Sequence, residues 1–178
     1  LDNLTAAKPI LERHDAPATV FLATGCIERG ERYWWDRLSD GIHAPQQFPA
    51  ELHLEGSNGP FSWRDERVTG SAAAQGAARR ALLDALWHWL VPLSDDARDR
   101  CLSALDQWAG HPGSLDATAR PMSPGQVAEL VAGGLMRAGA HTANHVHLPL
   151  LDREQGLAEI IQSRRDCSRL AGAEPDCF

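Results

Sequence analysis

The sequence lacks several features that would assign it to a specialised class of protein. No apolar run reaches the roughly 18 residues that span a bilayer, and no stretch resembles the apolar region of a secretory signal peptide. Clustered lysine and arginine are also missing: the formal net charge is -7, and the pI is about 5.5. The two basic pairs, Arg79-Arg80 and Arg164-Arg165, are typical of solvated helix faces. We therefore expect no transmembrane segment and no nucleic-acid partner.

Paired cysteines are absent as well. The chain has four isolated cysteines, namely Cys26, Cys101, Cys167 and Cys177, and no C-x-x-C pair. This spacing predicts neither a zinc ribbon nor a disulfide scaffold, so we expect reduced thiols that are buried one by one.

What the sequence does contain is enough material for one ordinary globular domain. A chain of 178 residues with 43% hydrophobic residues can bury a core. Residues 2–14 predict a helix, with Asp2 or Asn3 as N-cap and Leu4, Ala7, Ile10 and Leu11 on one face. The apolar run Ala18–Ala23 then predicts a parallel strand that is buried on both faces.

The middle of the chain, residues 28–120, has a different character. It contains all six tryptophans, two long helical patterns, and two short alternating segments separated by a Gly-rich turn. We interpret it as a mainly helical insertion with a β-hairpin. Indole rings stack on pyranose faces and could form a sugar-binding surface, but core packing is the favoured interpretation for most of them.

From residue 121 the alternation of helix and strand returns. Ser123 to Gln126 predicts a capping box, residues 135–140 predict a strand, and Asp152 to Gln155 predicts a second capping box. The helix that follows would present Leu157, Ile160 and Ile161 on one face, and Cys177-Phe178 is typical of the start of a strand.

Three histidines, His141, His145 and His147, lie close together after the predicted strand 135–140. Two imidazoles four residues apart converge if the backbone between them turns helically, and imidazole is the commonest ligand of transition metals. His141 and His145 have this spacing, whereas His147 does not. The plainer interpretation is a polar surface loop. The position favours a site, because ligand sites of parallel α/β folds form at the carboxyl ends of strands.

Two blocks of the chain resemble the polysaccharide deacetylases of the NodB homology type, carbohydrate esterase family 4. Residues 1–24 are similar to the helix and strand that follow the family's Thr-Phe-Asp-Asp-Gly motif, and His141-Thr142-Ala-Asn-His145 matches its His-Thr/Ser-x-x-His motif. The resemblance implies an α/β fold, an irregular (β/α) barrel of the NodB type that is incomplete here. Residues 1–178 would then be a fragment of a single NodB-like domain, and residues 28–120 an insertion within it.

The same resemblance implies a metal-dependent hydrolase that removes the N-acetyl group from a sugar in a polysaccharide or glycan precursor. A divalent metal, most often zinc, would be held by His141, His145 and an aspartate, with one position left open for catalysis. Thr142 would orient the motif loop by hydrogen bonding. His147 has no counterpart in the motif, and Val146 stands where many members have proline.

The catalytic residues themselves cannot be assigned within this chain. Both aspartates of the family belong to the Asp-Asp-Gly motif, which would precede Leu1, and the downstream arginine and Pro-Tyr motif would follow Phe178. We therefore expect a piece of a longer protein that is inactive alone. Two alternatives remain: an amidohydrolase of the same superfamily that acts on a ureide-like amide, and a non-catalytic carbohydrate-binding or scaffold protein.

Overall fold

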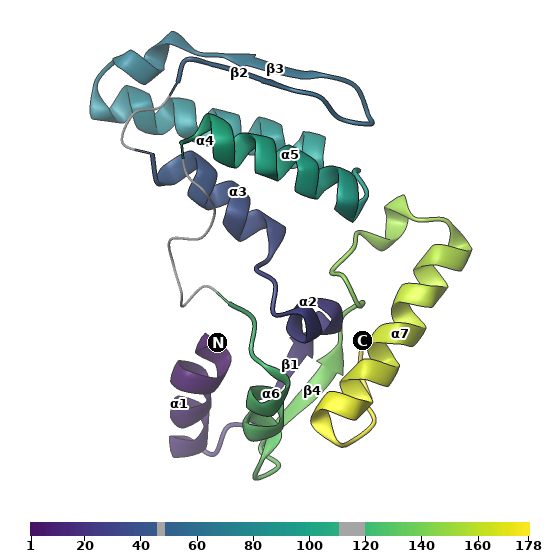
Figure 1. The fold of residues 1–178 in the computed structure, drawn as a ribbon. Coiled ribbons are helices and arrows are strands. Elements are labelled where there is room, and N and C mark those ends of the chain that lie inside the picture. Colours follow the sequence, from purple (N-terminus) through teal and green to yellow (C-terminus); the bar gives the residue numbers. More distant parts are fainter. Residues whose placement is uncertain (46–48, 111–119) are drawn as a thin grey trace. The chain divides into compact units, whose positions relative to one another are not determined.

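The computed structural model describes residues 1–45, 49–110 and 120–178. Within these ranges the chain is a mixed α/β protein with seven α-helices and two small two-stranded sheets, and it contains no closed barrel (Figure 1). It divides into two compact units, Leu1–Arg32 with Thr118–Phe178, and Tyr33–Ala117. The predicted α/β class is confirmed at this coarse level.

The first unit consists of two parallel strands and the helices that connect them. Its elements are η1 (Asn3–Ala7), α1 (Lys8–Arg13), β1 (Ala18–Leu22), α2 (Thr24–Arg29), α6 (Pro124–Val131), β4 (Met136–Ala140), η3 (Leu148–Leu150) and α7 (Arg153–Ala171). β1 pairs with β4 in parallel, with Leu22 opposite Ala140. The carboxyl ends of both strands therefore meet at one edge of the sheet (Figure 1).

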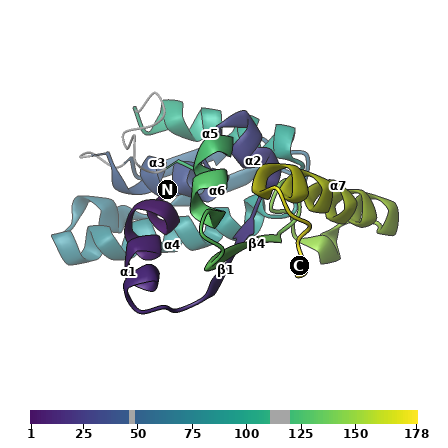
Figure 2. The same cartoon turned by 90° about the horizontal axis from the view of Figure 1, so that it is seen from below.

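The core of this unit lies between the sheet and its helices. Its most deeply buried side chains are those of Leu22, Val127, Leu130, Met136 and Cys167. α1 and α6 lie side by side in both views (Figures 1 and 2), and the Lys8 ammonium joins them. It donates to the carbonyl oxygens of Glu129, Leu130 and Ala132, the last two at 3.1 Å. These carbonyls belong to the end of α6, where helix carbonyls have no partner within the helix.

Two predicted apolar faces and one predicted helix cap of this unit are wrong. β1 is not buried on both faces, because Thr19 is exposed and Phe21 is 47% exposed. Ile10 is exposed rather than packed, and Asp2 has helical backbone angles without a side-chain cap. Hydrophobic spacing identifies the residues of one face, but which face is covered depends on the elements packed against it.

α7 shows the same error more clearly. The predicted stripe fails because Leu157 and Ile161 are exposed, whereas the helix buries Cys167 and Leu170 near its C-terminal end. The N-terminal half of α7 runs past the end of β4 (Figure 1), so the core of this unit contacts mainly the other half.

The second unit packs a β-hairpin and three helices. Its elements are α3 (Trp34–His43), β2 (Glu51–Leu54), β3 (Phe61–Arg64), η2 (Glu66–Thr69), α4 (Ala72–Leu90) and α5 (Asp95–Trp108). The predicted hairpin is confirmed: β2 and β3 are antiparallel, with Leu54 opposite Phe61. The core contains leucines from three helices, among them Leu38, Leu82, Leu86, Leu102 and Leu105. That this unit is an insertion in a family domain stays a prediction.

Most of the tryptophans pack against this core, as the favoured interpretation predicts. Trp34, Trp63, Trp89 and Trp108 are half-buried against it. Trp87 is 37% exposed and lies beside Trp34, with ring centroids 4.7 Å apart.

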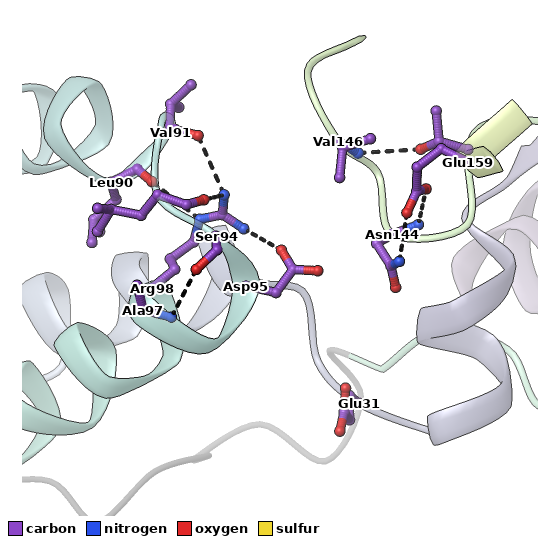
Figure 3. Close-up of polar contacts among 12 residues, drawn as sticks. Glu31, Leu90, Val91, Ser94, Asp95, Ala97, Arg98, Asn144, Val146 and Glu159 are labelled. Atoms are coloured by element: carbon purple, nitrogen blue, oxygen red, sulfur yellow. Dashed lines mark hydrogen bonds and ion pairs between the residues drawn. The ribbon is translucent and has the colours of Figure 1, made fainter. Parts of the chain in front are cut away.

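A buried arginine closes the end of α4. Arg98 is 9% exposed, and its guanidinium donates to the carbonyl oxygens of Leu90, Val91 and Leu93 and to the Asp95 carboxylate (Figure 3). The guanidinium carbon also lies 5.0 Å from the ring centroid of Trp34. Because each of the three guanidinium nitrogens donates to at least one acceptor, the charge is compensated where water is largely excluded.

All four cysteines are reduced thiols; Cys26, Cys101 and Cys167 are buried, whereas Cys177 is half-buried. The carbonyl oxygen of Cys177 accepts a hydrogen bond from the Ala140 amide of β4 at 3.1 Å. The predicted strand start at Cys177-Phe178 therefore lies against β4, although no strand is formed there. In the part of the chain that is described, no helix has the length and apolar character needed to cross a membrane.

Candidate metal site

The candidate site is a loop at the carboxyl edge of the parallel sheet. β4 ends at Ala140 and leads into His141–His147, and β1 ends at Leu22 and leads into α2. The two connections touch: the Gly25 amide donates to the Ala143 carbonyl oxygen at 2.8 Å. Gly25 is required at this contact, because a β-carbon there would lie 3.0 Å from that oxygen and 2.8 Å from Oδ1 of Asn144. The histidines thus occupy the predicted position at the strand ends.

The loop is not helical, and two left-handed residues shape it instead. Thr142 has φ 56° and His145 has φ 55°. A non-glycine residue in this region costs of order 1–3 kcal/mol, and a β-branched residue such as threonine is a rarer case still. Such a conformation persists only where neighbouring groups hold it.

Thr142 supplies one of the interactions that hold the loop. Its side chain is 4% exposed, and Oγ1 accepts a hydrogen bond from the Val146 amide at 3.2 Å. This contact closes the loop across four residues and brings His145 back toward His141.

Glu159 of α7 supplies a second set of interactions. Its Oε2 accepts from the amides of Ala143 at 2.8 Å and Asn144 at 3.0 Å, and its Oε1 accepts from Nδ2 of Asn144 at 2.8 Å. Figure 3 shows the carboxylate facing Asn144. Oδ1 of Asn144 in turn accepts from Nη1 of Arg29 at 3.0 Å. Sequence reasoning missed Glu159, because no local pattern connects it to the histidines.

The loop brings the two predicted ligands together. The ring centroids of His141 and His145 are 4.7 Å apart, with an interplanar angle of 81°. The Phe21 ring lies 6.0 Å from that of His141. His145 is half-buried, whereas His141 and His147 are exposed.

The surroundings of His145 favour its neutral form. Burial lowers the pKa of His145, and positive charge on His141 and His147 lowers it further, against a smaller opposing effect of a backbone hydrogen bond. A neutral imidazole keeps the lone pair that a metal ion requires.

The spacing of the two rings suits a shared metal ion. Two imidazoles that bind one tetrahedral zinc ion through nitrogen have ring centres about 5 Å apart, and the observed separation is 4.7 Å. Across the described residues, no group of three or more His, Cys, Asp and Glu side chains is arranged to hold a metal. The loop therefore brings together two imidazoles.

Comparison of the chain with models of known protein families, with curated proteins and with solved structures gave no match.

Proposed function

We propose that this chain carries two metal ligands of a de-N-acetylase of the polysaccharide deacetylase type, which removes the N-acetyl group from a sugar in a glycan or its precursor. The observation that carries the proposal is the pairing of His141 and His145 at the carboxyl edge of a parallel sheet. Their ring centroids are 4.7 Å apart. Their motif, His-Thr-x-x-His, is the family's metal motif.

The proposal extends to the fold and to the missing ligands. β1 and β4 would be two neighbouring strands of an irregular (β/α) barrel, each followed by a connection that reaches the site. The third ligand and the general base would be aspartates that lie outside the 178 residues. The metal would be divalent, with zinc the best match to imidazole and carboxylate ligands.

Three residues of the loop have a role in this proposal. A bound divalent ion would polarise the N-acetyl carbonyl group. His141 and His145 would hold it, and the lowered pKa of His145 keeps that imidazole available at neutral pH. Thr142 fixes the turn between the two rings through the Val146 amide.

The proposal is tested on the complete protein that contains this chain. Purified with zinc, it is expected to release acetate from N-acetylhexosamine oligomers. The His141→Ala variant is expected to lose both bound zinc and at least about 100-fold of the activity, because a centre with one imidazole fewer binds metal poorly.

His147→Ala is the matched control, since His147 lies outside the motif and is expected to leave zinc content and activity near those of the wild type. Unchanged zinc content in His141→Ala would remove this residue as a ligand. If the protein released ammonia from a ureide but no acetate from the oligomers, its substrate would be a non-sugar amide instead of an N-acetylated sugar.

One observation favours a second candidate, a carbohydrate-binding protein without catalysis. The Trp87 ring is partly exposed in a cluster with Trp34, and exposed indoles stack on sugar rings. Oligomer binding that is lost in Trp87→Ala, with no acetate released by the wild type, would support this reading.

A further inference from the structure

We infer that Glu159 is the positioning residue of the imidazole pair and acts on both rings through the backbone between them. The inference concerns the geometry of the loop; only the purpose of that geometry rests on the proposed function.

The contacts of Glu159 span the strained part of the loop. Its carboxylate accepts from the amides of Ala143 and Asn144, and these are the two residues between Thr142 and His145, both of which have positive φ. Ala143 is 7% exposed, so its amide would be buried without a partner if the carboxylate were removed. The conformation that turns His145 toward His141 thus depends on an acceptor at this point.

A carboxylate matches all three donors of this contact at once. Three donors converge on Glu159: two backbone amides and Nδ2 of Asn144. An ionised carboxylate has two oxygens that only accept, whereas the amide of glutamine would direct a donor at one of these donors. Hydrogen bonds to a charged acceptor are also stronger than neutral ones.

Glu159 can hold the loop in place because α7 is a capped helix whose C-terminal end packs into the core of its unit. The helix begins at the capping box of Asp152 and Gln155 and packs Cys167 and Leu170 into the core of its unit. On the other side of the loop, α2 contributes the Gly25 amide to Ala143 and the Arg29 guanidinium to Asn144. The loop is therefore held between two helices, and Glu159 makes three of its contacts.

The first test measures the loop without any metal. In the 178-residue chain, Glu159→Ala is expected to raise amide exchange at Ala143 and Asn144 by about tenfold or more and to weaken the proton–proton NOE between the rings of His141 and His145. Glu154→Ala, the same change at an exposed site in the first turn of α7, is expected to change neither. Exchange at the core amides of α6 should be the same in all three proteins, which separates loss of positioning from loss of fold.

The second test measures the consequence for zinc in the complete protein. Glu159→Ala is expected to weaken zinc binding by about 10- to 100-fold, as removal of a group that orients metal ligands typically does. If the wild type binds no zinc, the proposed function fails, and the exchange and NOE results still decide the inference about Glu159. A wild-type NOE together with unchanged exchange in Glu159→Ala would overturn it.

Glu159→Asp, which keeps the charge, provides a second test in case the first variant does not fold. Glu159→Asp retains both oxygens but withdraws them by one methylene group, so faster exchange at Ala143 and Asn144 is expected with the helix intact. Exchange as slow as in the wild type would also overturn the inference.

Discussion

Thr142 and His145 hold backbone angles that glycine adopts freely and that other residues avoid. The loop retains them because its polar groups are matched on both sides: Oγ1 of Thr142 faces the Val146 amide, and Glu159 faces the amides of Ala143 and Asn144. At this scale the site is a set of backbone hydrogen bonds that point two rings at one another.

The contribution of the Thr142 hydroxyl can be measured directly. Thr142→Val keeps the β-branched shape but removes the acceptor for the buried contact, so the free energy of unfolding is expected to fall by about 1–2 kcal/mol. Urea unfolding measures the change. Thr142→Ser retains the hydroxyl oxygen, so its free energy of unfolding is expected to fall by less. An equal decrease in both variants would show that the effect comes from packing.

The Cys167 thiol is expected to make the free energy of unfolding fall as the pH rises. Burial, with a smaller effect of the Cys177 charge, raises its pKa from 9.0 to about 11. A raised folded-state pKa means that the folded protein holds the proton longer than the unfolded chain. The protonated Cys167 thiol therefore stabilises the fold fully below pH 9, and this stabilisation is lost as the pH rises toward about 11.

The check compares the wild type with Cys167→Ala. The free energy of unfolding of the wild type is expected to fall more steeply between pH 9 and pH 11 than that of the variant. Parallel pH profiles would show that this thiol ionises equally in both states.

At the scale of single residues, the histidine pair was predictable from sequence and Glu159 was not. The spacing of His141 and His145 is a local pattern, and the structure brings the two rings together. Glu159 follows His145 by fourteen residues, and the return of α7 past the loop is a tertiary event. No periodicity distinguishes this glutamate from Glu154 on the same helix.

At the scale of elements, helix starts were the most predictable features. The capping boxes at Ser123 and Asp152 are both formed, because their side chains bond to amides only three residues away. The hairpin of β2 and β3 is likewise a local signal of alternation around a glycine turn. Buried faces were less predictable. Leu157 and Ile161 satisfy the helical period but are exposed, because the core contacts the C-terminal part of α7.

The cap of α7 carries a prediction of its own. Asp152→Ala removes the acceptor for the Gln155 amide, a bond of 2.8 Å, and is expected to lower the free energy of unfolding by about 1 kcal/mol. Thermal unfolding followed by circular dichroism measures this effect. Asp152→Ser should recover most of it, and a variant as stable as the wild type would show that the cap is dispensable.

At the scale of the whole molecule, the described residues form two hydrophobic cores, one in each unit. One contains Leu130 and Val127, and the other contains Leu86 and Leu82. Helix-forming and strand-forming segments were readable from sequence, but sheet closure was not, because it depends on pairing between strands far apart in the chain. The residues described here form two small sheets, and the barrel stays a proposal.

Separate cores predict separate responses to cavities. Leu86 and Leu130 are both fully buried, and replacing either with alanine is expected to cost about 2–5 kcal/mol. Hydrogen exchange should accelerate within Tyr33–Ala117 for Leu86→Ala and within the other unit for Leu130→Ala. Acceleration of the whole chain in either variant would show that the two units unfold together.

The contact of Lys8 with the end of α6 also limits how the protein can be labelled. Lys8 is the only lysine among the 178 residues, and its ammonium supplies donors to three backbone carbonyls of the α6 end. Acylation by an amine-reactive dye or support would remove the charge and two of its three N–H donors. Amine-directed conjugation would therefore perturb the helix that precedes β4, the strand from which the histidine loop departs.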